Sequence, residues 1–194
     1  MSVRCVRVLG GGMSRIFADI FSRPRNRRRT DVDATVVADQ VWARFRPRLV
    51  DELSGDNAAA CAQMRALLDA CRDRDEEAQI VCLRRFTESF RRIGLTKSVQ
   101  FYPYLRWALQ NDQVAAKQFQ SVHAGVERLA LSIEAILSEY LGGPWDREQR
   151  RRFVGEVVRI ASFFSQTLRA EESVLYPLYL PPGQYRYVGG GPWT

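Results

Sequence analysis

Apolar residues recur three and four positions apart from about residue 34 to residue 180. This spacing places them on one face of an α-helix, and no stretch alternates with period two for long enough to form a strand. The chain is therefore expected to be all-α. The pattern predicts one short helix and then four longer ones, over 34–53 and about 56–74, 76–110, 112–141 and 146–179.

Helix-breaking residues separate the predicted helices. Ser-Gly-Asp at 54–56 precedes the first long helix, and Gly-Gly-Pro at 142–144 follows the third. Pro47 is expected to bend the short N-terminal helix. Four amphipathic helices with short connections are typical of an up-down-up-down four-helix bundle. We therefore expect such a bundle over 56–180, with an additional helix before it.

The two ends of the chain differ from the helical domain, which covers 34–180. Residues 1–33 combine a Gly-Gly-Gly break with a run of arginines, and they are expected to form a basic, flexible arm in which Met13 is an alternative start. Residues 181–194 are rich in glycine, proline and aromatic residues, which predicts an extended or disordered tail. The alternative is a tail that docks, because its aromatic rings offer contact area to a partner.

The excess of positive charge comes almost entirely from arginine. The chain of 194 residues has 29 basic and 22 acidic side chains, a formal net charge of +7 and only two lysines. Such a balance permits contact with nucleic acid or with an acidic protein and selects neither. The candidate for this contact is the cluster in the N-terminal arm, formed by Arg23, Arg25, Arg27, Arg28 and Arg29.

The four cysteines, Cys5, Cys61, Cys71 and Cys82, show no C-x-x-C spacing. The sequence also shows no secretory signal pattern and no apolar run long enough to cross a bilayer. We therefore expect reduced cysteines, a cytoplasmic location and no insertion into a membrane.

Polar residues interrupt the apolar face of the predicted helices. In the fourth long helix, Thr167 and Glu171 continue the spacing of the apolar residues before them. Lys97 takes such a position in the second long helix, His123 in the third and Cys61 in the first. A buried polar side chain is costly unless it has a partner. These five residues are therefore the candidates for a functional site in the interior.

Two segments end in nearly the same way, FYPYL at 101–105 and LYPLY at 175–179. Each Tyr-Pro follows an Arg-Arg-Phe sequence, at 84–86 and at 151–153, and the second interval is longer by seven residues. Seven residues are about two helical turns, so the same helix face stays inward. We interpret the echo as a pair of helices repeated once, with chance as the alternative in an arginine-rich chain.

With these motifs the chain over about 56–180 resembles the hemerythrin-like (HHE cation-binding) domains. In that family a four-helix bundle holds two irons by a histidine in helix one, His-x-x-x-Glu in helix two, a histidine in helix three and His-x-x-x-Glu in helix four. TLRAEESVLYPLY at 167–179 is similar to the last motif, and GLTKSVQFYPYL at 94–105 to the second. SVHAGVERLALSI at 121–133 is similar to the third motif and AACAQMRALLDAC at 59–71 to the first.

Most of the six metal ligands that the resemblance implies are replaced, and only His123 and Glu171 are kept. Two donors on separate helices cannot hold a di-iron centre, so no cofactor is expected. The alternative is a mononuclear zinc or iron site in which Cys61 joins His123 and Glu171. The replaced ligand positions hold Cys61, Ile93, Lys97 and Thr167.

The resemblance also implies that Lys97 and Glu171 face each other, because the two glutamates of the family approach each other through the metals. We expect a buried Lys97–Glu171 pair in place of the iron, with His123 and Thr167 as hydrogen-bonding neighbours. The alternative is that Lys97 extends its long apolar stem and places its ammonium at the end of the bundle.

These features predict a metal-free regulatory or protein-interaction module and not an enzyme, because the sequence offers no nucleophile–base pair and no phosphate-binding loop. FTESFRRIGLTKSVQFYPYL, at 86–105, also resembles the Rsd/AlgQ regulators, helical bundles that bind a sigma factor, although Lys97-Ser98 replaces the Gly-His pair of that family. Two alternatives stay open. One is an iron-dependent sensor of oxygen, nitric oxide or redox state that uses His123, Glu171 and Cys61, and the other is nucleic-acid binding by the arginine arm.

Overall fold

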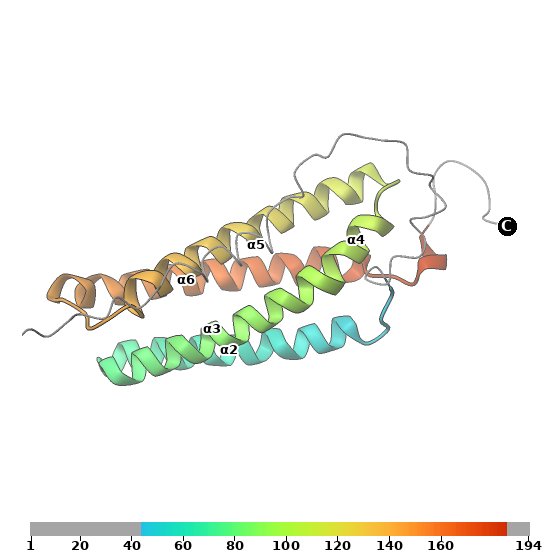
Figure 1. Ribbon diagram of the computed structural model, residues 1–194. Coiled ribbons are helices and arrows are strands. Elements are labelled where there is room, and N and C mark those ends of the chain that lie inside the picture. The colour runs from blue at the N-terminus through green and yellow to red at the C-terminus, as the bar shows by residue number, and fades with distance from the viewer. Residues whose placement is uncertain (1–43, 186–194) are drawn as a thin grey trace, which may run out of the picture.

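The computed structural model describes residues 44–185, and helices make up almost all of this part of the chain (Figure 1). It contains no strand, so the predicted all-α class is confirmed for these residues. None of the helices described has the length and hydropathy needed to span a membrane. The α-helices are α2 (Leu49–Asp73), α3 (Glu76–Thr96), α4 (Tyr102–Ala108), α5 (Gln113–Tyr140) and α6 (Arg147–Ala170).

Two π-helices and two short 3-10 helices complete the described chain. The π-helices continue α3 and α6, and the 3-10 helices follow the second of them. They are η3 (Lys97–Phe101), η4 (Glu171–Leu175), η5 (Tyr176–Leu178) and η6 (Pro182–Gln184). The predicted arm at 1–33, the first part of the helix predicted at 34–53 and the tail from residue 186 lie outside the described residues.

Helix α2 runs without interruption through the Ser-Gly-Asp sequence at 54–56, where a break was predicted. Pro47 lies in a turn before the helix and does not bend it, and residues 44–46 are not helical. A glycine inside a helix costs only about 1 kcal/mol. Leu53 and Ala60, both fully buried on either side of Gly55, offset that cost by packing in the core. The expected boundary at this point is therefore wrong.

Local capping explains where the other helices begin and end. Arg74 has a left-handed backbone (φ 57°) and ends α2, and the side chain of Asp75 accepts a hydrogen bond from the backbone N–H of Ala78 at the start of α3. Asp146 forms a capping box with Gln149 at the start of α6. Asp112 caps α5 in a similar way. These three capping aspartates lie close to the predicted starts of the second, third and fourth long helices.

The Tyr-Pro echo marks the two π-helices. In η3 the backbone N–H of Tyr102 donates to the carbonyl of Lys97, and in η4 that of Tyr176 donates to the carbonyl of Glu171. The residue after each tyrosine is a proline, which has no N–H and whose ring would collide with the carbonyl four residues earlier in an α-helix. A wider turn relieves this collision, and π-turns of this kind occur often at functional sites.

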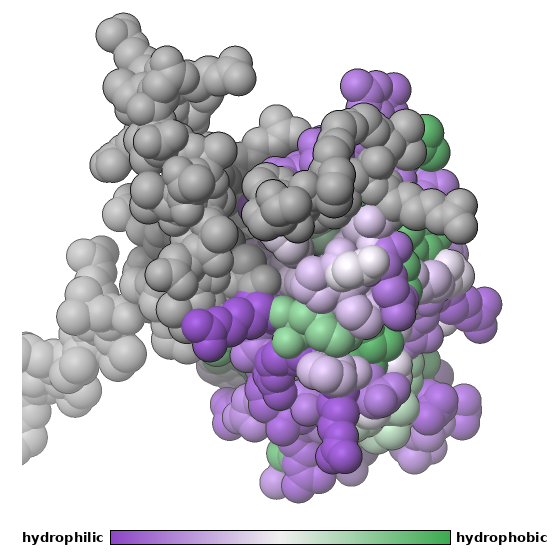
Figure 2. All heavy atoms as spheres, turned by 90° about the vertical axis from the view of Figure 1, so that its right-hand side faces the viewer, coloured by the Kyte–Doolittle hydropathy of each residue, from purple (hydrophilic) through white to green (hydrophobic). Residues whose placement is uncertain are grey.

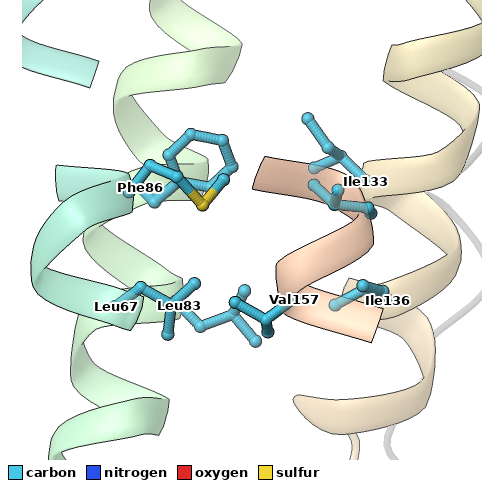
Figure 3. Close-up of a pocket in the computed structure, with 8 residues that line it drawn as sticks. Leu67, Leu83, Phe86, Ile133, Ile136 and Val157 are labelled. Carbon is cyan, nitrogen blue, oxygen red and sulfur yellow. The ribbon is translucent and has the colours of Figure 1, made fainter. Parts of the chain in front are cut away.

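The long helices pack as two pairs, α2 with α3 and α5 with α6 (Figure 1). A small cavity lies between the pairs, with side chains of all four helices around it, and its lining is wholly apolar (Figure 3). Leu67 and Phe86 project from the first pair, and Ile133 and Val157 from the second. This level of the core holds the two pairs together by apolar contact alone.

Aromatic side chains close the end of the molecule at which η3 and η4 lie. The hydroxyl of Tyr104 donates to the backbone carbonyl of Leu180 (2.5 Å), and the hydroxyl of Tyr185 donates to the backbone carbonyl of Leu178 (2.7 Å). The tail predicted to start at residue 181 is therefore packed on the bundle as far as Tyr185. We call this the aromatic end, formed by Phe45, Phe101, Tyr104, Trp107, Tyr176, Tyr179 and Tyr185.

Candidate functional site

The first residues of the two π-helices form an ion pair in the interior. Lys97 begins η3 and Glu171 begins η4, and the two side chains are 4% and 1% exposed. The Nζ atom of Lys97 lies 2.5 Å from Oε2 of Glu171. The structure therefore brings these two predicted site residues together. The alternative in which Lys97 extends its ammonium to the end of the bundle is wrong.

Two further side chains complete the hydrogen bonding of the pair. The hydroxyl of Tyr102 donates to Oε1 of Glu171 (2.6 Å), so that both carboxylate oxygens have a partner. The ammonium of Lys97 also donates to Oδ1 of Asn57 (3.2 Å). A buried charge is tolerated only when it is paired and hydrogen-bonded, and both charges here meet this condition.

The amide nitrogen of Asn57 connects the Lys97–Glu171 pair to η4 and η5, which follow α6. Nδ2 of Asn57 donates to the hydroxyl of Tyr176 (2.9 Å) and to Oε1 of Glu172 (2.9 Å). Asn57 is 1% exposed and comes from α2, so one side chain joins that helix to η3, η4 and η5. We call the set Asn57, Lys97, Tyr102, Glu171 and Tyr176 the polar network.

The polar network repeats one arrangement on two helices. Tyr102 comes five residues after Lys97, and Tyr176 comes five residues after Glu171. Tyr102 bonds directly to the charged residue of the other helix, whereas Tyr176 reaches Lys97 through Asn57. The echo in the sequence thus corresponds to two matching charge–tyrosine units that meet across the core.

Burial keeps both tyrosine hydroxyls protonated. Burial first and the neighbouring Glu171 carboxylate second raise the pKa of Tyr102 well above its ordinary value. The pKa of Tyr176 is raised by burial and then by Glu171 and Glu172. A phenol whose pKa is raised stays neutral near pH 7 and can donate a hydrogen bond.

His123 and Thr167 do not take the roles predicted for them. Nδ1 of His123 lies 3.5 Å from Oε1 of Glu127, and its ring stands edge-on to that of Tyr102 at 4.5 Å between centroids. Burial is the main reason that its pKa is lowered, and Glu127 acts in the opposite sense. Thr167 is buried, but within the described chain it makes no hydrogen bond to Lys97 or Glu171. The hydrogen-bonding neighbours of the pair are Asn57 and Tyr102 instead.

Cys61 lies one helical turn beyond Asn57 on α2 and is half-buried. Burial is the largest cause that raises the pKa of its thiol. Among residues 44–185, no group of three or more His, Cys, Asp and Glu side chains is placed to share a metal ion, so Cys61, His123 and Glu171 do not converge. The residue of α2 that reaches the pair is Asn57, one turn before the predicted position.

The residues at the centre of the polar network do not fit a di-iron site. A di-iron site needs several anionic or imidazole donors, and here an ammonium is bound to the only carboxylate of the pair. Both oxygens of that carboxylate are already engaged, by Lys97 and by Tyr102. A metal cation would meet a like charge at Lys97 and a carboxylate whose two oxygens already accept hydrogen bonds.

Three members of the polar network were missed by reading the sequence. Tyr102 and Tyr176 stood in the Tyr-Pro echo, which was used only as evidence of repetition. Asn57 continues the buried spacing from Leu53 to Ala60, which would have been visible had the helix not been predicted to start at residue 56. The arginine cluster of the arm lies outside the described residues, so the nucleic-acid alternative is not addressed by this geometry.

No protein-family model, no curated protein and no solved structure matches this chain.

Proposed function

We propose that this protein is a metal-free interaction module with a regulatory role, built on an up-down-up-down bundle of the hemerythrin-like type. The contact of the Lys97 ammonium with Glu171 and Asn57 carries the proposal. Under this proposal, the Lys97 ammonium takes the place at which hemerythrin-like domains hold iron. The protein is proposed to act in the cytoplasm by binding another protein.

The charge balance of the interior supports a scaffold without a cofactor. One ammonium neutralises one carboxylate, and two neutral side chains, Asn57 and Tyr102, form hydrogen bonds with these charged groups. A bundle with an ammonium at this point needs no bound metal in order to fold. It differs in this respect from metal sites in which the free energy of metal binding is part of the free energy of folding.

Burial also argues against catalysis at the polar network. Lys97, Glu171 and Asn57 are at most 4% exposed, which leaves a substrate no access to them. The cavity between the helix pairs has an apolar lining that includes none of the three. A catalytic group must come within hydrogen-bond reach of the substrate, so we assign the polar network a structural role and the function to the surface.

Metal analysis tests the proposal. The full-length chain, expressed with excess iron, is expected to contain no stoichiometric iron or zinc and to show no absorption band of an oxo-bridged iron pair. Treatment with a chelator should leave the midpoint of unfolding unchanged, since no metal contributes to stability. Iron at about two ions per chain, lost together with stability on chelation, would contradict the proposal.

A further inference from the structure

The aromatic end carries half-buried rings at the surface. Phe45, Trp107 and Tyr185 are partly exposed and pack against the core beneath them. Phe45 lies against Tyr179 (5.2 Å between centroids), and Trp107 lies against Tyr104 (5.8 Å). Figure 2 views the molecule from this side and shows, among the described residues, a group of apolar side chains with hydrophilic ones beside them. Tryptophan and tyrosine anchored in this way are the residues that contribute most at protein interfaces.

Exposed arginines border these rings. Arg44 and Arg48 flank Phe45 in sequence and Arg106 precedes Trp107, and all three are exposed. No acidic side chain of residues 44–185 lies within ion-pair distance of any of them, whereas Arg46 between them is paired with Glu52 (2.9 Å). Among residues 44–185, the charge of these three guanidinium groups is therefore not neutralised by an ion pair.

Both limits of the described chain lie at this end. Phe45, next to the first described residue, is stacked on Tyr179, and Tyr185, the last described residue, lies 6.3 Å from Tyr104 between ring centroids. The sequence before Arg44 contains the arginine cluster at 23–29. Residues 30–43 separate this cluster from Arg44 and hold three aspartates and no basic residue, so the positive charge considered at the aromatic end is that of the described arginines.

We propose that the aromatic end is the surface through which the protein binds its partner, and that the partner presents an acidic segment of polypeptide. The inference rests on the proposed interaction function and adds the place of contact and the charge of the ligand. Half-buried tryptophan and tyrosine beside arginine are the composition of protein-binding hot spots. Single-stranded nucleic acid fits less well, because the rings pack against one another and are not open platforms for stacked bases.

Binding of model ligands to the full-length chain tests the surface. The probes are a fluorescein-labelled oligoglutamate, an acidic peptide with interspersed leucines, and a labelled oligothymidylate. The triple variant R44E/R48E/R106E should lose affinity for both peptides by about tenfold or more at low salt. The leucine-containing peptide should bind the unmodified chain more tightly than oligoglutamate does, because it also covers the aromatic rings.

A matched variant separates this surface from general attraction of a basic protein. R84E/R151E/R159E makes the same change of charge at exposed arginines of α3 and α6 that lie away from the aromatic end. This variant should change peptide affinity by less than about threefold. Both triples replace exposed side chains, so both should fold, which circular dichroism will verify.

Three results would overturn the proposal. Equal loss of affinity in the two triples would show attraction by net charge alone. Tighter binding of oligothymidylate than of either peptide would make the aromatic end a nucleic-acid surface, and absence of peptide binding would remove the surface altogether. None of these results bears on the metal content, so a metal-free chain that fails this test would refute the inference and leave the metal-free part of the proposed function standing.

Discussion

The core has two levels at which helices are held together by different forces. At the polar network, Asn57, Lys97 and Glu171 join α2, η3 and η4 by directional bonds between 2.5 and 3.2 Å. At the cavity, Leu67 of α2 and Val157 of α6 belong to a lining that consists of apolar side chains only. Apolar contact depends on area and tolerates changes of shape, whereas a buried ion pair depends on both partners being present. The two levels should therefore respond very differently to substitutions of similar size.

The largest expected difference comes from placing methionine at each level. Lys97→Met removes the ammonium and leaves the Glu171 carboxylate buried without its ion-pair partner, which should lower the free energy of unfolding by about 3–5 kcal/mol. Leu67→Met keeps volume and polarity at the cavity and should cost less than about 1.5 kcal/mol. Denaturant unfolding monitored by circular dichroism measures both. Equal effects would mean that the two levels do not differ in kind.

A double-mutant cycle sharpens this result. Glu171→Leu alone should be as damaging as Lys97→Met, because it leaves the ammonium without a counter-charge. Lys97→Met/Glu171→Leu removes both charges, so the double variant should be clearly more stable than the sum of the single losses implies. Strictly additive losses would show that the pair contributes no coupling free energy.

A smaller effect is expected at the residue that links the polar network to α2. Asn57→Ala removes an acceptor from Lys97 and a donor from Tyr176 and Glu172, and should cost about 1–3 kcal/mol. The neighbouring Asp56→Ala removes a partly exposed ion pair with Arg92 and none of the hydrogen bonds of the polar network, and should cost less than about 1 kcal/mol. If the two variants unfold at the same denaturant concentration, Asn57 does not tie the helices together.

The smallest effect concerns pH at the border of the polar network. Burial lowers the pKa of His123 in the folded protein, so the unfolded chain binds its proton at higher pH. The stabilisation from the neutral ring is therefore present above the ordinary histidine pKa of about 6.5 and is lost as pH falls through the lower folded value. Glu127, Arg106 and the Tyr102 hydroxyl are the charged or titratable groups near this ring.

His123→Gln provides the comparison, since glutamine cannot titrate. Between pH 7 and pH 5 the unmodified protein should lose more stability than this variant, with the difference measured by denaturant unfolding at each pH. A variant with the same pH dependence as the unmodified protein would show that the ring is solvated equally in the folded and unfolded states.

The sequence by itself determined the helices, most of their ends and the presence of charge in the interior. These properties depend on short-range relations along the chain: the three-and-four spacing, a carboxylate at a helix start, and a proline that forbids an α-turn. Lys97 and Glu171 could be placed on inward faces for this reason. The position of Tyr102 and Tyr176 five residues further on was equally visible.

Only the tertiary structure decided how these side chains are paired. Helix α2 passes through Gly55 because its buried residues on both sides pack in the core, and this continuity brings Asn57 to Lys97. His123 turns to Glu127 and not to Glu171, although it lies on the same inward face. A helix face is determined by spacing within one segment, but a hydrogen bond is determined by distances of a few tenths of an ångström between segments far apart in the sequence.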